Sequence, residues 1–248
     1  MEPGKLIGTG TRAEIYDVNG KAFKLYHADV SKQIAFYEAN VSSLMEQYFL
    51  GAPAIYEVTR LEDRWALVME LIKGDNFGDL LKNDPANAPA VMEELVDHQL
   101  RMHAIDGHLP LDLQDRLRSA ITAAPADEAL RRNLSERLLS LHGERKLCHG
   151  DFHPYNLMRT TSGVRILDWM DASNGVPEAD ACRTWLILTL NYADWEGALP
   201  RLYLETYARM SGKPVEDILI WLPIVACDRL RENFPGEREQ LMEWIQTI

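Results

Sequence analysis

The pattern of apolar residues changes near residue 70, and this change constrains the fold more than any other feature. Before it, short runs of alternating apolar and polar residues are typical of strands. Five such runs occur, at residues 5–8, 13–18, 21–26, 55–60 and 65–69. Asn19-Gly20 is typical of a two-residue hairpin turn. Between the third and fourth runs, residues 32–50 predict one helix, with Ser31 at its N-cap.

Helical periodicity dominates the rest of the chain. It predicts helices over residues 89–103 and 126–141, and several more from about residue 178 onward that are broken at Pro200, Pro214 and Pro235. The apolar run 218–227 predicts a buried helix. We therefore expect an α+β protein with two lobes. Residues 1–70 form a small antiparallel sheet lobe, residues 71–75 a hinge, and residues 76–248 a larger helical lobe.

Composition limits the function classes. The chain has 248 residues and a formal net charge of −12, which argues against nucleic acid as a partner because phosphate binding needs a positive face. An acidic balance is compatible with a cationic small-molecule partner, and equally with a surface that is charged for solubility. Three widely spaced cysteines, no signal-peptide pattern and no apolar run long enough to span a bilayer predict a cytoplasmic protein without a membrane segment.

One loop carries residues that suit phosphoryl transfer. It reads His149-Gly150-Asp151-Phe152-His153-Pro154-Tyr155-Asn156, and Asp168 follows a short predicted strand at 164–167. Phosphoryl transfer needs a carboxylate near the accepting hydroxyl and oxygen ligands for magnesium. Asp151 can orient the hydroxyl and accept its proton, while the side-chain oxygens of Asn156 and Asp168 can bind Mg²⁺.

Two other interpretations of this loop remain open. His-Gly-Asp and Leu-Asp-Trp also occur in ordinary turns. The alternation of His149, Asp151 and His153 could instead place three ligands around zinc. A zinc site would leave Asn156, Asp168 and the whole N-terminal sheet without a role.

The loop, together with Ile166-Leu167-Asp168-Trp169, resembles the catalytic motifs of the aminoglycoside phosphotransferase and choline kinase-like family. The resemblance implies a protein-kinase-like fold, with ATP as donor and Mg²⁺ as cofactor. It implies that Asp151 is the catalytic base and that Asn156 and Asp168 bind Mg²⁺. The absence of an Ala-Pro-Glu motif and of a long activation segment favours a small-molecule kinase over a regulated protein kinase.

The resemblance also assigns roles in the N-terminal lobe. Lys24 lies on the third predicted strand, where this family has a lysine that contacts the nucleotide phosphates. Glu38 is the best partner for Lys24, and Glu46 is an alternative. An exposed strand lysine and a solvated helix glutamate remain the simpler interpretations.

Four more residues are predicted, with less specificity, to contact the nucleotide. Gly8 and Gly10 form a reduced glycine-rich loop, in which Ala13 stands at the position of the third glycine. Two glycines between strands are also common in a plain hairpin. Backbone groups near Glu70 and Ile72 fall at the predicted hinge and would contact the purine; the same residues also suit a final core strand and a linker.

The sequence leaves the acceptor open. We expect a small molecule with a hydroxyl group, and an amine-bearing one such as an aminoglycoside or choline is compatible with the acidic residues Asp194, Glu196, Glu205, Glu232 and Glu237. Asp171 suits either a role beside Asp168 or a capping role, and the resemblance implies that Asp180 anchors the catalytic segment. A non-catalytic nucleotide-binding protein of the same fold and an AMP transferase are the alternatives.

Overall fold

The computed structural model describes residues 4–48, 50–192 and 197–247. By its internal contacts the chain divides into two units. The first comprises residues 1–83 and 154–171, and the second comprises residues 84–153 and 172–248. The chain therefore leaves the first unit and returns to it for the segment that carries Asn156 and Asp168. The predicted lobes, residues 1–70 and 76–248 with a hinge at 71–75, were defined by sequence pattern and not by internal contacts, and they stay a prediction.

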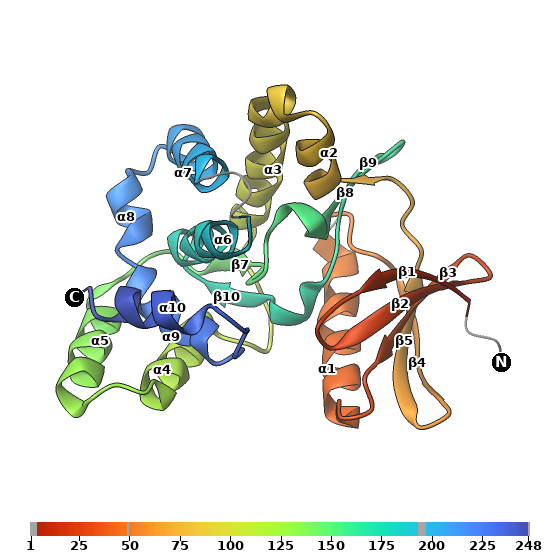
Figure 1. The fold of residues 1–248 in the computed structure, drawn as a ribbon, viewed down its shortest axis with the longest axis horizontal. Helices are drawn as coiled ribbons and strands as arrows, with labels where there is room; N and C mark the ends of the chain where they lie inside the picture. Colours follow the sequence, from red (N-terminus) through yellow and green to blue (C-terminus); the bar gives the residue numbers. More distant parts are fainter. Residues whose placement is uncertain (1–3, 49, 193–196, 248) are drawn as a thin grey trace. The chain divides into compact units, whose positions relative to one another are not determined.

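The first unit is built on a five-stranded antiparallel sheet (Figure 1). All five predicted strands are present, in the spatial order β1-β2-β3-β5-β4. They are β1 Lys5–Thr9, β2 Ala13–Val18, β3 Lys21–Tyr26, β4 Ile55–Leu61 and β5 Arg64–Glu70. The hairpin between β2 and β3 turns at Asn19 and Gly20, which both have positive φ, as a two-residue turn of this kind requires.

Helix α1 (Lys32–Met45) packs against this sheet. The contact forms a core in which Ala13, Tyr26, Ala35 and Leu67 are buried. The predicted helix 32–50 is too long, because α1 ends at Met45 and a 3-10 turn, Glu46–Tyr48, follows it. Ser31 is at the N-cap as predicted, but its side chain makes no capping hydrogen bond.

A second, three-stranded sheet completes the first unit. It has the order β6-β8-β9 and contains β6 (Asp75–Asn76), β8 (Leu157–Thr160) and β9 (Gly163–Ile166). Helix α2 (Phe77–Asn83) follows β6. This helix packs on the 3-10 turn Pro154–Asn156, and a Cβ atom on Gly78 would lie only 2.5 Å from the Tyr155 ring.

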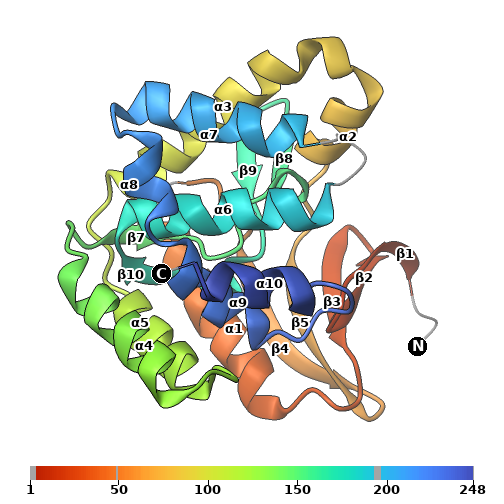
Figure 2. The ribbon, with the colours of Figure 1, turned by 60° about the vertical axis from the view of Figure 1, so that its left-hand side comes forward.

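The second unit is mostly helical, and Figure 2 shows α3 beside α7 and α4 beside α5. Its helices are α3 Ala88–His103, α4 Leu113–Ala123, α5 Glu128–Ser140, α6 Pro177–Asn191, α7 Ala198–Ser211, α8 Val215–Leu219, α9 Leu222–Leu230 and α10 Arg238–Ile245. Two short antiparallel strands, β7 (Lys146–Cys148) and β10 (Ser173–Gly175), pair within it.

Two predictions about the C-terminal helices are wrong. Pro200 does not break a helix: it lies in the first turn of α7, where backbone N–H groups have no partner within the helix and a proline removes nothing. The apolar run 218–227 is not one helix, because it spans the end of α8 and most of α9, and Pro223 lies in the first turn of α9.

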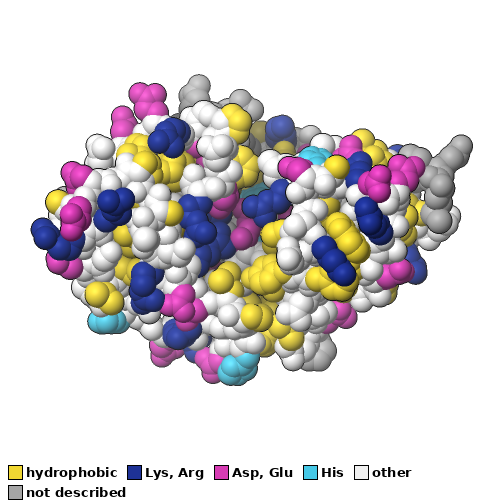
Figure 3. All heavy atoms as spheres, turned by 90° about the horizontal axis from the view of Figure 1, so that it is seen from below, with side chains coloured by type: hydrophobic (Ala, Val, Ile, Leu, Met, Phe, Trp, Pro, Cys, Tyr) yellow, Lys and Arg dark blue, Asp and Glu magenta, His cyan; other side chains and the backbone are white. Residues whose placement is uncertain are grey.

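In the described part of the chain, no helix combines the length and the apolar character that crossing a membrane requires. On the face of the molecule in Figure 3, Lys and Arg side chains lie among Asp and Glu side chains.

Candidate active site

Three of the residues predicted to act at the nucleotide phosphates, Lys24, Glu38 and Asp168, form one cluster in the first unit. The Nζ of Lys24 lies 2.6 Å from Oε1 of Glu38 and 3.1 Å from Oδ1 of Asp168. Glu38 is buried in α1, and its second oxygen accepts a hydrogen bond of 2.6 Å from the Tyr26 hydroxyl. The predicted Lys24–Glu38 ion pair is therefore present. Glu46, the alternative partner, instead accepts from the backbone N–H of Ile55.

Burial and charge act against each other in this cluster. Burial by itself lowers the pKa of Lys24, but the carboxylates of Asp168 and Glu38 outweigh it, so the pKa of Lys24 lies above its usual value. Burial raises the pKa of Glu38, and the Lys24 ammonium opposes that shift. Lys24 is consequently a fixed positive charge, which is what binding a phosphate group requires.

The two predicted magnesium ligands lie in the same unit as Lys24, at the two ends of the β8–β9 hairpin. Asn156 directly precedes β8, and Asp168 lies two residues after β9. The backbone N–H of Leu167 donates to the carbonyl oxygen of Asn156 at 2.8 Å and closes the base of the hairpin. Asp168 has φ of +57°, and its side chain is 42% exposed. Its carboxylate is thus held by Lys24 on one oxygen while remaining accessible.

A salt bridge fastens this hairpin to the sheet. Arg165 in β9 donates to both carboxylate oxygens of Glu70, at 3.0 and 2.5 Å, and to the carbonyl oxygens of Gly51 and Ala52. The hydrogen bond from Arg165 lowers the pKa of Glu70, and this effect outweighs burial, which acts to raise that pKa. Glu70 therefore holds β9 through its side chain, and its backbone N–H donates to Ala54. Its predicted contact with a purine stays a prediction, as does that of Ile72, which lies half-buried after β5.

The glycine-rich loop lies between β1 and β2. Gly8 is in β1, and the N–H of Gly10 donates to the carbonyl oxygen of Ala13 at 2.8 Å. Neither glycine has positive φ. A Cβ atom on either would make only ordinary contacts, at 3.6 Å from Ile15 and 3.5 Å from Ala13. The fold therefore does not require glycine at either position, and their predicted role in binding phosphate remains a prediction.

The predicted catalytic base lies in the second unit. The backbone N–H of Asp151 donates to Nδ1 of His149 at 3.2 Å, and Nε2 of His153 lies 3.5 Å from the Asp151 carboxylate. Burial acts to raise the pKa of Asp151, but the hydrogen bond and charge of His153, with Arg183 and His149, hold it well below its usual value. Asp151 is therefore ionised at neutral pH and able to accept a hydrogen bond from a hydroxyl.

Side chains of helix α6 hold both backbone polar groups of Gly150, the residue before Asp151. Asp180 accepts from the N–H of Gly150 at 2.7 Å, and Nε of Arg183 donates to the Gly150 carbonyl oxygen. Gly150 has φ of +79°, a conformation that favours glycine. Asp180, in the first turn of α6, therefore holds the backbone just before Asp151, which is the anchoring role expected of it.

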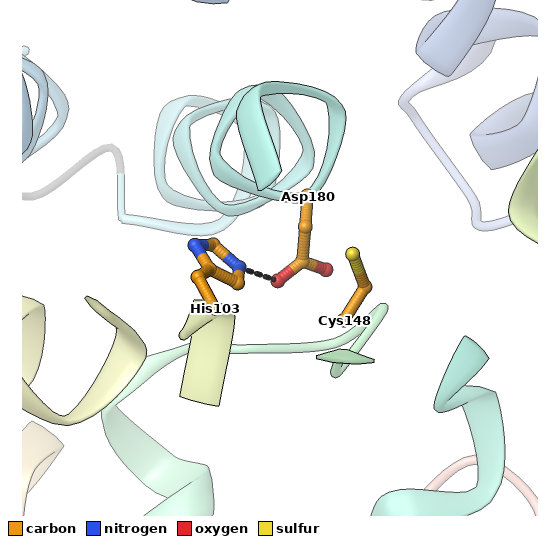
Figure 4. Close-up of side chains that lie close together, drawn as sticks. All are labelled: His103, Cys148 and Asp180. Atoms are coloured by element: carbon orange, nitrogen blue, oxygen red, sulfur yellow. Dashed lines mark hydrogen bonds and ion pairs between the residues drawn. The ribbon is translucent and has the colours of Figure 1, made fainter. Parts of the chain in front are cut away.

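Asp180 also belongs to a buried group with His103 and Cys148 (Figure 4). Among the described residues, this is the one set of three or more His, Cys, Asp or Glu side chains whose ligand atoms approach within 4.8 Å of one another. The zinc alternative built from His149, Asp151 and His153 is therefore wrong. The oxygens of Asp180 already accept from His103 at 3.0 Å and from Gly150, so the buried group is a hydrogen-bonded support for the loop.

Among the described residues, the acidic side chains that suggested a cationic acceptor, Glu205, Glu232 and Glu237, all lie beside arginines. Glu232 and Glu237 make ion pairs with Arg229, and Glu232 also pairs with Arg183. Glu205 lies 3.9 Å from Arg201. Asp194 and Glu196 lie outside the described residues. Glu232 and Glu237 therefore balance buried arginines, and the described acidic residues give no specific support to a cationic acceptor.

The residues that hold the site were not predicted from the sequence. Tyr26, Arg165 and Arg183 were not singled out, since their partners are 12, 95 and 33 residues away. A weak signal existed for Tyr26 alone: it follows Lys24 by two positions and so shares its face of β3.

Three comparisons bear on these observations. The model of the family described as "Phosphotransferase enzyme family" matches residues 6–219. A comparison with curated proteins finds no match. Many solved structures are similar in fold.

Three of these solved structures represent the kinds of protein that share the fold. The aminoglycoside phosphotransferase APH(3'')-Id from Streptomyces rimosus, in complex with ADP and streptomycin, is 14% identical over 91% of this chain and 93% of its own, with a TM-score of 0.64. A thermostable mutant of APH(4)-Ia with AMP-PNP and hygromycin B is 14% identical over 97% and 89%, with a TM-score of 0.67. A choline/ethanolamine kinase family protein from Mesorhizobium loti is 14% identical over 99% and 88%, with a TM-score of 0.59. At these identities the similarity establishes a shared fold, the two-lobed protein-kinase-like fold that the sequence analysis expected.

Proposed function

The chain belongs to the phosphotransferase enzyme family, and from this premise we propose that it transfers the γ-phosphoryl group of ATP to a hydroxyl group of a small molecule. The observation that carries the proposal is the ion-paired cluster of Lys24, Glu38 and Asp168. A fixed ammonium beside an accessible carboxylate suits the phosphate chain of a nucleotide.

The side chains of Asn156 and Asp168 have the chemistry that Mg²⁺ prefers, an amide oxygen and a carboxylate. Asp168 fits this role because it is accessible and one of its oxygens is already oriented by Lys24. Bound there, the ion would neutralise charge on the phosphate groups. Lys24 would contact the same phosphates directly, and Glu38 would keep it oriented.

In the second unit, Asp151 would accept a hydrogen bond from the acceptor hydroxyl and take its proton during transfer. Its lowered pKa keeps it ionised at neutral pH, as this role requires. His153 is 3.5 Å from the Asp151 carboxylate and supports its charge. Backbone groups near Glu70 and Ile72, together with the loop at Gly8 and Gly10, would contact the purine and the phosphates.

The candidate acceptors follow from what the similar solved structures contain. The solved relatives named above carry streptomycin and hygromycin B or belong to the choline/ethanolamine kinase family. We therefore place amino sugars and amino alcohols first among the candidates, ahead of neutral sugars. Neither a nucleic acid nor a membrane enters the proposal, and the proposed location is the cytoplasm.

The experiment is an acceptor screen with Mg²⁺ and ATP, using amino sugars, choline, thiamine and neutral sugars, with mass spectrometry of the products. Addition of a phosphoryl group to one acceptor supports the proposal. Addition of an adenylyl group would replace it with AMP transfer. Nucleotide binding by calorimetry without turnover of any acceptor would favour a non-catalytic nucleotide-binding protein of the same fold.

A further inference from the structure

Arg12 lies in the turn between β1 and β2, next to the start of β2. The turn is tied to the sheet: the carbonyl oxygen of Arg12 accepts from the N–H of His27 at 2.8 Å, and Gly10 bonds to Ala13. The side chain is exposed. Its position is therefore set by the sheet, while its guanidinium is open to solvent.

The guanidinium of Arg12 has an unusually weak partner. Its Nη1 lies 3.6 Å from Sδ of Met170, and a thioether is a weak acceptor. Other arginines of the first unit, such as Arg64 and Arg165, pair with carboxylates. Among the described residues Arg12 has no carboxylate partner. Its planar group of donors is therefore available to an anion, and phosphate is one that it fits in a bidentate manner.

Two cations from different parts of the sheet converge on one short segment. Lys24 contacts Asp168, and Arg12 contacts Met170, two residues further along the chain. Lys24 is matched by Glu38, and Asp168 adds further negative charge. Because Lys24 is already matched by Glu38, Arg12 adds to this segment a positive charge that no carboxylate among the described residues matches.

We propose that Arg12 binds the terminal phosphate of the nucleotide, as a second cation beside Lys24. The inference rests on the proposed function. Arg12 directly precedes Ala13, the residue that stands where a third glycine would allow close backbone contact with phosphate. A side-chain contact from Arg12 takes the place of that backbone contact.

The test compares the affinities of Mg²⁺-AMP-PNP, Mg²⁺-ADP and adenosine for the full chain by calorimetry. In Arg12→Met, which keeps an unbranched side chain without its charge, we expect the Kd of AMP-PNP to rise about tenfold or more. We expect the Kd of ADP to rise by about threefold at most, and that of adenosine to stay unchanged. Arg12→Lys should retain part of the affinity, since lysine keeps the positive charge but lacks the paired N–H donors that bind phosphate in a bidentate manner.

Arg132→Met is the matched control, because Arg132 is 69% exposed on α5 in the other unit; it should leave all three affinities unchanged. Equal losses for AMP-PNP and ADP, or no loss for either, would overturn the assignment of Arg12 to the terminal phosphate while leaving the proposed kinase intact. Failure of the wild-type protein to bind either nucleotide would overturn both.

Discussion

The backbone N–H of Gly150 donates to Oδ1 of Asp180 at 2.7 Å, and the carbonyl oxygen of the same glycine accepts from Arg183. Both polar groups of this residue are therefore held by side chains one turn apart on α6. Arg183 is in turn paired with Asp228 and Glu232 near the C-terminal end of α9. The position of Asp151, the next residue, depends on this support.

Replacing Asp180 with asparagine tests the support. Asp180 is buried, and although burial raises its pKa, the hydrogen bond and charge of His103 and the Gly150 N–H hold that pKa below its usual value. Asp180→Asn removes the charge and should lower the free energy of unfolding by about 3 kcal/mol in urea titrations. In the fraction that folds, kcat should fall at least about tenfold while the Kd of the nucleotide stays the same. Asp63→Asn, at a position 97% exposed, is the control and should change neither value.

Gly150 offers a second test of whether the backbone before Asp151 positions the base. Gly150 and Gly20 both have φ of +79°. A Cβ atom at either position costs roughly 1–2 kcal/mol of unfolding free energy because an L-residue disfavours this conformation. Gly150→Ala should also lower kcat, since it moves the residue before Asp151. Gly20→Ala, in the β2–β3 turn where a Cβ atom meets nothing within 4 Å, should lose stability alone. Wild-type turnover in Gly150→Ala would show that this backbone conformation does not position the base.

Local patterns of the sequence were sufficient for the strands of the first unit. Alternation of apolar residues and the Asn19-Gly20 turn are short-range signals, and all five strands followed from them. The Lys24–Glu38 pair followed from the family resemblance, which assigns a phosphate-contacting lysine to the third strand, and from the preference of such a lysine for a glutamate partner.

Short or mixed-period segments were not predictable in this way. Helix α4 (Leu113–Ala123) was missed, and β6 consists of only two residues. The support around the site depends on tertiary contacts. Arg165 and Glu70 are 95 residues apart, and no periodicity in either segment indicates that they meet.

The Arg165–Glu70 salt bridge should measurably stabilise the first unit. A double-mutant cycle with Arg165→Met and Glu70→Gln should give a coupling free energy of about 1 kcal/mol, because both side chains are only partly buried. Arg165→Met alone should also weaken Mg²⁺-dependent nucleotide binding, since β9 leads directly to Asp168. The exposed pair Arg60–Asp63 is the matched control and should show coupling near zero. A null coupling at Arg165–Glu70 would mean that the hairpin is held by its backbone contacts.

The pH dependence of turnover should report on His153. Burial would raise the pKa of Asp151, and His153 is the largest influence that lowers it. The base is active when ionised, so activity is present above its pKa and lost as pH falls through it. His153→Gln removes this influence on Asp151 and should move the acid limb of the kcat profile to higher pH, with little change at pH 8. His142→Gln, on the segment between α5 and β7, is the control. An acid limb that stays in place would contradict the assignment of Asp151 as the base.

The proposed phosphoryl transfer depends on Asp151 as the base and on Asp168 as a magnesium ligand. Steady-state turnover of Mg²⁺-ATP with the best acceptor, measured in Asp151→Asn and Asp168→Ala beside the wild type, tests it most directly. We expect kcat to fall about 10²–10⁴-fold in Asp151→Asn, with nucleotide affinity retained. In Asp168→Ala we expect both turnover and its dependence on Mg²⁺ to be lost. Wild-type Mg²⁺-dependent turnover in both variants would contradict the account.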